Sequence, residues 1–268
     1  MPSNRDALRR RLRSRVERRY ALRETAFTFG SLVLPFTRVA DPDRVLDEVA
    51  EEEDRLERVS GVRATSDQLH LPYWAELWDS AIGIGQWLAQ NCGGRGWQVG
   101  GGKERSGQSI TTHDSITTHD PLPPTHVNVL DLGCGMGLAG TVAAALGARV
   151  LFADLEAPAL LFAQLNSFPW RQRVRTRQLN WQTDRLDQRF DLILGADILY
   201  ERKQWEYLEP FWRTHVAAGG MVLLGEPGRQ TGDIFVDWIS ARGWQLTRHA
   251  EKVETRPVPI RLFELRLP

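Results

Sequence analysis

The stretch VNVLDLGCGMGLAG at residues 127–140 decides how this chain folds. It begins as a short apolar run that ends in an acid, as a buried strand does, and then breaks into glycines that open a helix. Glycines at such a turn let the backbone pass close to a ligand, and the start of the helix offers unpaired N–H groups. The stretch therefore predicts a strand, a turn and a helix that bind a nucleotide-type cofactor.

Two classes of cofactor fit the glycine spacing. The glycines from Gly135 onward satisfy the GxGxxG pattern of dinucleotide-binding proteins, and Asp154 ends the next strand, where an acid that binds ribose belongs. Asp131, however, lies inside the strand two residues before Gly133, where its carboxylate would repel a pyrophosphate. S-adenosylmethionine has no phosphate and carries an α-ammonium and a sulfonium, which a carboxylate attracts. The DxGxGxG arrangement thus favours S-adenosylmethionine over the dinucleotide of a dehydrogenase.

This stretch resembles motif I of the class I, seven-strand methyltransferases. The resemblance implies an α/β fold, with a Rossmann-like seven-stranded sheet, helices on both faces and a C-terminal antiparallel strand pair. It also implies a set of cofactor-binding residues in the turn and at the end of the next strand. They are Asp131, Gly133, Cys134, Gly135, Gly137, Leu138, Asp154 and Leu155.

The chain beyond the glycine turn alternates helices and strands, which predicts a parallel sheet. The expected helices cover residues 138–146, 158–166, 205–216 and 234–242. The expected strands cover residues 149–154, 174–179, 190–196 and 220–225. Two further segments, 245–253 and 260–267, flank a turn at 255–259 and form the closing antiparallel pair.

Three further segments are similar to the family-16 protein lysine methyltransferases. Residues 71–88, LPYWAELWDSAIGIGQWL, resemble the helix before motif I, and the tryptophan matching Trp78 contacts the cofactor in that family. Taken alone, these tryptophans also fit core aromatics at helical spacing. Asn180 and Trp181 follow the third strand, where the family commonly has an acid and a tryptophan beside the adenine. An indole can stack on a purine and an amide can hydrogen-bond its exocyclic amine, so both residues are expected at the adenine.

The third segment, GADILY at residues 195–200, matches the DxxY signature of that family through Asp197 and Tyr200. Such sheets bind ligands at the carboxyl ends of their strands, so we expect Ala196 at the cofactor and both signature side chains at the transferred methyl group. As catalytic residues, Asp197 is expected to hold the incoming ammonium and Tyr200 to shape and orient the amine channel, and either could also act as the base. As bare residues, an aspartate and a tyrosine at this spacing could instead cap and pack against the next helix.

Residues 225–229, GEPGR, resemble the corresponding segment of the electron-transfer-flavoprotein β-subunit lysine methyltransferases and the nicotinamide N-methylase-like proteins. The resemblance covers residues 70–268 and implies an S-adenosylmethionine-dependent methyltransferase that acts on a protein lysine. A small-molecule N-methyltransferase of the nicotinamide type is the alternative, which a closed, apolar acceptor pocket would favour. A non-catalytic, cofactor-binding scaffold is a third possibility, and the intact DxxY signature argues against it.

Residues 1–69 are expected to form a charged, mostly helical extension before a catalytic domain at 70–268. Residues 1–25 hold nine arginines against three acids, whereas acids dominate residues 41–58. Both blocks carry apolar residues at helical spacing, which predicts two helices that are solvated or paired with each other. Alternatively, the arginine-rich helix binds an acidic protein surface or a nucleic acid backbone. Residues 27–39 between them have the composition of a β-hairpin, and Asp41 followed by Pro42 predicts the start of the second helix.

Residues 92–126 are rich in glycine and polar residues and repeat SITTHD at 109–114 and 115–120. They predict a disordered insertion, and low-complexity segments rarely orient metal ligands, so no metal site is expected there. With only two cysteines and no apolar run that suits a membrane span, the chain is expected in the cytoplasm and away from membranes. No aromatic clamp for a flipped base follows the fourth strand, which argues against a nucleic acid substrate.

Overall fold

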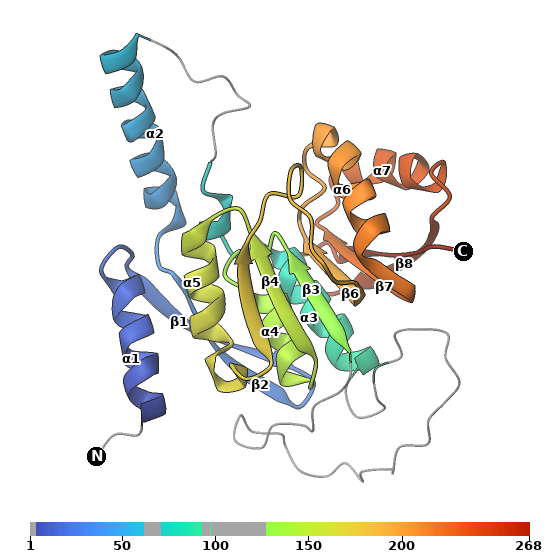
Figure 1. Cartoon of the computed structure of the whole chain (residues 1–268), viewed down its shortest axis with the longest axis horizontal. Helices are drawn as coiled ribbons and strands as arrows, with labels where there is room; N and C mark the ends of the chain where they lie inside the picture. The colour runs from blue at the N-terminus through green and yellow to red at the C-terminus, as the bar shows by residue number, and fades with distance from the viewer. Residues whose placement is uncertain (1–3, 62–70, 93–96, 98–126) are drawn as a thin grey trace.

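A computed structural model gives the structure of residues 4–61, 71–92, 97 and 127–268. The expected insertion and its SITTHD repeat lie outside these residues, apart from Cys92 and Trp97. Seven strands form one sheet in the order β5-β4-β3-β6-β7-β9-β8 (Figure 1). They are β3 (Asn128–Leu132), β4 (Arg149–Asp154), β5 (Val174–Gln178), β6 (Phe190–Ala196), β7 (Val216–Glu226), β8 (Gln245–Glu251) and β9 (Ile260–Arg266).

The pairing of these strands confirms the predicted α/β fold. β3 pairs in parallel with β4 and β6, and the parallel part extends to β5 on one side and β7 on the other. β9 is antiparallel to both β7 and β8, and it lies between them. The sheet is therefore Rossmann-like, seven-stranded and closed by the expected antiparallel pair.

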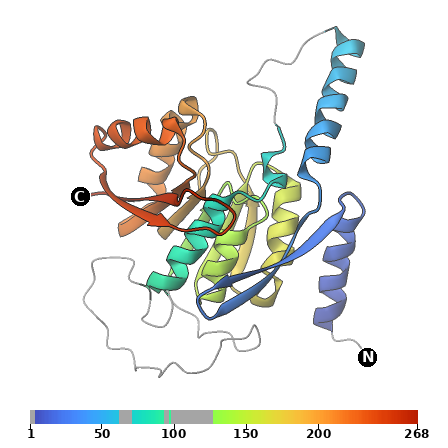
Figure 2. The same cartoon turned by 180° about the vertical axis from the view of Figure 1, so that it is seen from behind.

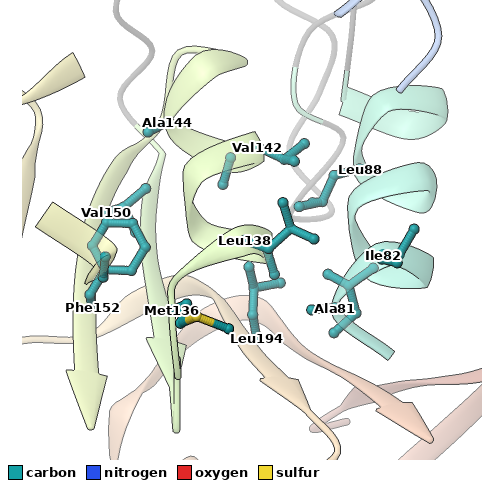
Figure 3. Packing of buried hydrophobic residues seen from close by; sticks show 14 of the residues in the cluster. Ala81, Ile82, Leu88, Met136, Leu138, Val142, Ala144, Val150, Phe152 and Leu194 are labelled. Carbon is teal, nitrogen blue, oxygen red and sulfur yellow. The ribbon is translucent and has the colours of Figure 1, made fainter. Parts of the chain in front are cut away.

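Helices cover both faces of this sheet because alternate strand residues point to opposite sides. Val129 of β3 joins the core under α3 (Asp79–Cys92), α4 (Leu138–Ala145) and α5 (Ala157–Asn166). Leu130 joins the core under α6 (Arg202–His215) and α7 (Gln230–Ser240). Figure 3 shows side chains of α3 and α4 meeting in the first of these cores.

The segment before α3 departs from the prediction of one helix over residues 71–88. Tyr73–Ala75 form only a single 3-10 turn, η1, because Glu76 adopts an extended conformation and interrupts the helix. The helix α3 begins at Asp79. Trp74 and Trp78 thus precede the helix, and the helical spacing expected for them is wrong.

The N-terminal residues form α1 (Asn4–Glu17), a hairpin of β1 (Leu22–Phe29) and β2 (Leu32–Val39), and α2 (Pro42–Ser60). The expected start of α2 is confirmed, since the Asp41 side chain accepts a hydrogen bond from the N–H of Arg44 at 3.2 Å. Figures 1 and 2 show α1 beside α5 and α2 projecting beyond the other end of the molecule. The two charged helices therefore do not pair along their lengths.

The hairpin shares the core of the sheet and is tied to the glycine turn through α5. Phe29, Leu34 and Phe36 are buried in the same apolar cluster as α3, α4 and α5. The Asn166 side-chain oxygen accepts the N–H of Thr37 at 2.8 Å, and its nitrogen donates to the carbonyls of Thr37 and Met136, both at 3.0 Å. One buried amide thus joins the hairpin, α5 and the turn that follows β3.

We expect Asn166→Leu to lower the free energy of unfolding by about 3 kcal/mol, because it leaves buried backbone groups of Thr37 and Met136 without partners. Urea denaturation followed by tryptophan fluorescence measures the loss. Gln164→Leu is the control, since its nitrogen bonds the Thr176 hydroxyl at 2.6 Å in a partly buried place that water can reach. An equal loss in both variants would contradict the role given to Asn166.

Candidate active site

The turn between β3 and α4 packs closely against two other elements. Gly133 and Gly137 have φ angles of +63° and +82°, a region that only glycine adopts readily. A Cβ at Gly133 would lie 3.4 Å from the ring of Trp181, and a Cβ at Gly137 would lie 2.7 Å from the Cβ of Ala163. The turn therefore needs glycine for its conformation and for its neighbours, and it lies beside Trp181.

Asp131 lies beneath this turn and is buried. Its Oδ2 accepts the N–H of Gly140 at 2.8 Å, so the carboxylate stabilises the positive end of α4. Burial raises the pKa of Asp131 to about 7. The hydrogen bond from Gly140 shows that Asp131 stabilises the turn. A direct contact between Asp131 and the methionine part of the cofactor stays a prediction.

Asp154, at the end of β4, is joined to the same turn. Its Oδ2 accepts the N–H of Gly135 at 2.8 Å and its Oδ1 accepts the N–H of Glu156 at 2.9 Å. Burial raises the pKa of Asp154 to about 6. The expected ribose-binding acid and the glycine turn are thus part of one hydrogen-bonded unit.

Three neighbours of this unit that were predicted at the cofactor are packed or hydrogen-bonded within the protein. The side chain of Leu138 points into the core (Figure 3). The carbonyl of Leu155 accepts a hydrogen bond from Gln178 at 2.8 Å. The N–H of Cys134 donates to Ala153 at 3.1 Å, and burial raises the pKa of its thiol well above the ordinary value. Cys134 is therefore not a thiolate nucleophile at neutral pH.

The residues expected at the adenine form a compact turn after β5. The side-chain oxygen of Asn180 accepts the N–H of Gln182 at 2.9 Å, so this oxygen is already used in a local turn. The indole N–H of Trp181 donates to the side chain of Gln204 at 3.0 Å. No motif marked Gln204, whose only signal is its place in the first turn of α6, close after the DxxY signature.

Asp197 directly follows β6 and has an unusual backbone conformation. Its φ of +57° is the one positive value among the described non-glycine residues, and its N–H donates to Gly225 at 2.9 Å. Aspartate tolerates this left-handed region better than most residues, and such conformations cluster at functional sites. Its carboxylate is paired with Arg229, which the sequence did not single out beyond the GEPGR resemblance.

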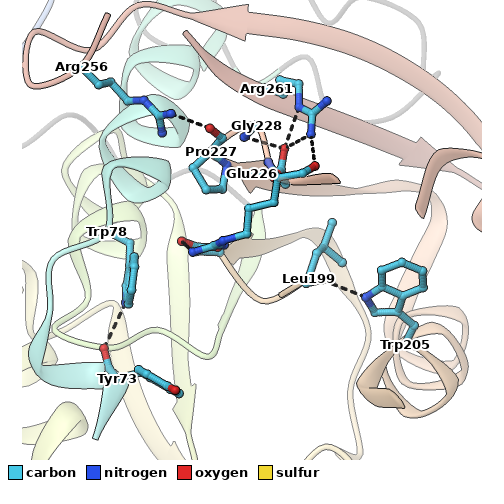
Figure 4. Close-up of polar contacts among 11 residues, drawn as sticks. Tyr73, Trp78, Leu199, Trp205, Glu226, Pro227, Gly228, Arg256 and Arg261 are labelled. Carbon is cyan, nitrogen blue, oxygen red and sulfur yellow. Dashed lines mark hydrogen bonds and ion pairs between the residues drawn. The ribbon is translucent and has the colours of Figure 1, made fainter. Parts of the chain in front are cut away.

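Three aromatic side chains gather beside Asp197. The ring centroid of Tyr73 lies 5.7 Å from that of Tyr200 and 6.4 Å from that of Trp78. The indole N–H of Trp78 donates to the carbonyl of Tyr73 at 3.0 Å (Figure 4). Tyr73 and Tyr200 are 42% and 45% exposed, so these rings form an open rim. No motif in the sequence marked Tyr73 as a functional residue.

The two halves of the site lie at one edge of the sheet. Ala196 ends β6 half-buried beside β7, and the turn after β3 begins at the corresponding end of the neighbouring strand. Burial raises the pKa of Tyr200, and the nearby groups of Glu201, Tyr73, Asp197 and Asp154 raise it further. The residues predicted from motif I and from DxxY therefore lie together at the carboxyl ends of neighbouring parallel strands, where such sheets bind ligands.

Residues 73–237 match a family model described as lysine methyltransferase. The chain belongs to this family. The protein N-lysine methyltransferases METTL21A of Danio rerio and Xenopus tropicalis are 41% and 42% identical to it over 104 residues, 36% of this chain and 47% of each relative. The chain thus spans about half the length of the curated relatives it matches. A crystal structure of the glycopeptide N-methyltransferase MtfA with S-adenosylmethionine has a TM-score of 0.47 and 18% identity, covering 54% of this chain and 89% of MtfA.

Membership in the lysine methyltransferase family confirms the family-16 resemblance on which the site was predicted. The matched region includes the glycine turn, Trp78, the DxxY signature and Arg229. In the part of the chain that the structure describes, no helix has both the length and the apolar character to cross a bilayer. Those residues also contain no group of three or more His, Cys, Asp or Glu side chains that could hold a metal ion.

Proposed function

We propose that this chain is an S-adenosylmethionine-dependent methyltransferase that adds methyl groups to a lysine side chain of a protein. The observation that carries the proposal is the position of Asp197. Its buried carboxylate lies at the end of β6, beside an aromatic rim and at the same sheet edge as the glycine turn. A cytoplasmic location belongs to the proposal, supported by the two cysteines, which are both free, as is usual in a reducing compartment.

The residues of the turn fit the proposed cofactor by their charge. Asp131 and Asp154 are both buried beside the turn. The Asp131 carboxylate suits the cationic ammonium and sulfonium and would disfavour a pyrophosphate, while Asp154 is the acid expected at the ribose hydroxyls. Trp181, beside Gly133, offers an indole face for the adenine, and Trp78, whose ring lies beside that of Tyr73, is the second tryptophan expected at the cofactor. When bound, S-adenosylmethionine supplies a methyl group on a sulfonium that departs as a neutral thioether.

The acceptor side must present the lysine nitrogen with a free lone pair. A lysine amine has an ordinary pKa of about 10.4, so it arrives mostly as an ammonium ion. The Asp197 carboxylate attracts that ion and holds it beside the rings of Tyr73 and Tyr200, and the nitrogen then has to lose its proton to solvent before it can attack. These residues then aim the neutral nitrogen at the methyl group.

The exposure of the rim supports a protein substrate over a small molecule. Tyr73 and Tyr200 keep more than a third of their surface open to solvent. A long lysine side chain on a protein surface can reach such a rim, whereas a nicotinamide-type substrate is better held in a closed apolar pocket.

Methyl transfer from radiolabelled S-adenosylmethionine into a size-fractionated cell extract tests this function. We expect label in a discrete protein band, and amino acid analysis of that band should yield methyl-lysine. Asp197→Asn, checked for cofactor affinity, is the control and should leave the band unlabelled. Label confined to the small-molecule fraction would indicate the nicotinamide-type activity, and binding of the cofactor without any labelling would support the scaffold.

Binding of S-adenosylmethionine is expected to release protons, so its affinity should rise by about tenfold or more between pH 5.5 and 7.5. Burial raises the pKa of Asp131 to about 7 and that of Asp154 to about 6, so both are partly protonated near pH 6. A cationic ligand favours the ionised forms. The stability of the fold depends on pH in the opposite direction. Asp131 and Asp154 bind protons more tightly in the folded chain than in the unfolded chain, so their contribution to the free energy of unfolding falls as the pH rises from about 4 to 7.

Isothermal titration calorimetry in two buffers of different ionisation enthalpy measures the protons released. Asp131→Asn should remove most of the pH dependence, because it eliminates the group with the higher pKa. An affinity that stays constant between pH 5.5 and 7.5 would show that the two carboxylates do not meet the charged part of the cofactor.

A further inference from the structure

Arg229 connects the acceptor acid with the tryptophan of the cofactor side. Its Nη1 pairs with Oδ1 of Asp197, and its Nη2 donates to Oδ2 at 3.1 Å. The guanidinium carbon of Arg229 lies 5.7 Å from the centroid of the Trp78 ring. The Asp197 side chain is 4% exposed and that of Arg229 is 36% exposed, so the arginine lies at the open side of the pair. A planar fork on both carboxylate oxygens fixes the orientation of the carboxylate.

The backbone that carries Arg229 is itself held firmly. Glu226 accepts the N–H groups of Gly228, at 2.8 Å, and of Arg229. Arg261 of β9 pairs with Glu226 at 2.5 Å and donates to the carbonyl of Arg229 at 2.7 Å. Arg256 donates to the carbonyl of Pro227 at 2.5 Å. Figure 4 shows this contact and those of Glu226 with Gly228 and Arg261. The Arg229 side chain therefore extends from a preorganised loop.

The charges around Asp197 act in opposite directions. Burial raises the pKa of Asp197, and the charge of Glu226 also raises it. The hydrogen bonds and charge of Arg229 lower it, as does the charge of Arg256. The charge of Asp197 in turn raises the pKa of Tyr200, three residues further along the chain. Arg229 is therefore the directly contacting group that stabilises the ionised form of Asp197, whereas burial favours the protonated form.

We propose that Arg229 is a positioning residue that keeps Asp197 an oriented, ionised carboxylate, which binds the acceptor ammonium and does not take its proton. The identity of the acceptor rests on the proposed function. Each carboxylate oxygen has a second lone-pair direction, so Asp197 can accept hydrogen bonds from an incoming amine while Arg229 stays in place. Because Arg229 favours the charged form of Asp197, the carboxylate is a poor acceptor for the proton of the ammonium, so that proton has to leave to solvent at the exposed rim before the nitrogen attacks.

A direct measurement of the carboxyl titration tests this inference without any substrate. The ¹³C carboxyl signal of Asp197, assigned by its disappearance in Asp197→Asn, should titrate at least one pH unit higher in Arg229→Gln than in the wild-type chain. Arg229→Lys should give an intermediate midpoint, since an ammonium keeps the charge without the fork. Arg242→Gln is the control, because that arginine pairs with exposed Glu206 and should leave the signal unchanged. Equal midpoints in Arg229→Gln and the wild-type chain would overturn the inference.

Methyl transfer into the same cell extract, measured from pH 6 to 9, supplies the second test. Arg229→Gln should lower kcat/KM by about tenfold or more, move the acid limb of the profile to higher pH, and leave cofactor affinity within about threefold. Arg229→Lys should recover part of the rate. An unchanged rate and profile in Arg229→Gln would overturn the inference. If the wild-type chain labels no protein, the proposed function fails, and the carboxyl titration still decides the role of Arg229.

Discussion

Asp197→Asn should lower kcat/KM for methyl transfer by about 100- to 1000-fold while the affinity for S-adenosylmethionine changes less than about threefold. Asparagine keeps the shape of the side chain and tolerates the φ of +57°, so the fold around the end of β6 should persist. It removes the negative charge that attracts the acceptor ammonium and pairs with Arg229. Initial rates with the labelled extract protein and calorimetric binding of the cofactor measure the two effects separately.

Asp233→Asn is the matched control for this experiment. The Asp233 side chain is 68% exposed and pairs with Arg261 at 2.5 Å, so its loss changes a nearby charge without touching Asp197. We expect its rate to stay within about twofold of the wild-type rate, because exposed pairs contribute little. Full turnover by Asp197→Asn, with cofactor affinity retained, would remove Asp197 from the chemistry.

The sheet and the cofactor side could be predicted because their signals are local. The apolar run before Gly133, the glycines and the acid at Asp154 encode a strand, a turn and a strand end within 28 residues of the sequence. Such patterns fix the element and its register together. The structure accordingly places Asp131, Asp154 and the turn in one hydrogen-bonded unit.

The acceptor side was only partly predictable, because its contacts join segments that are far apart. Asp197 and Arg229 are separated by 32 residues, and no periodicity encodes their pairing. Tyr73 reaches Tyr200 across the sheet edge only because η1 ends before α3. The helical pattern of residues 71–88 hid this break, since aromatic spacing alone does not show where Glu76 becomes extended.

Gly137→Ala should lower the free energy of unfolding by about 3 kcal/mol or more and abolish cofactor binding. The φ of +82° costs an alanine roughly 1–2 kcal/mol. The added Cβ would also lie 2.9 Å from the Cα of Ala163, a backbone atom of α5 that cannot move aside without shifting the helix. Urea denaturation and calorimetric titration with S-adenosylmethionine measure both losses.

Gly30→Ala separates the two causes, because Gly30 has a similar φ of +60° and no atom within 4 Å of the added Cβ. It should lose only the conformational part, roughly 1–2 kcal/mol, and should keep cofactor binding. Equal losses in the two variants would mean that α5 yields to the extra methyl group, and that packing of Gly137 against Ala163 does not shape the turn. A larger loss at Gly137, with binding gone, would show that the cofactor turn depends on the close approach of α5.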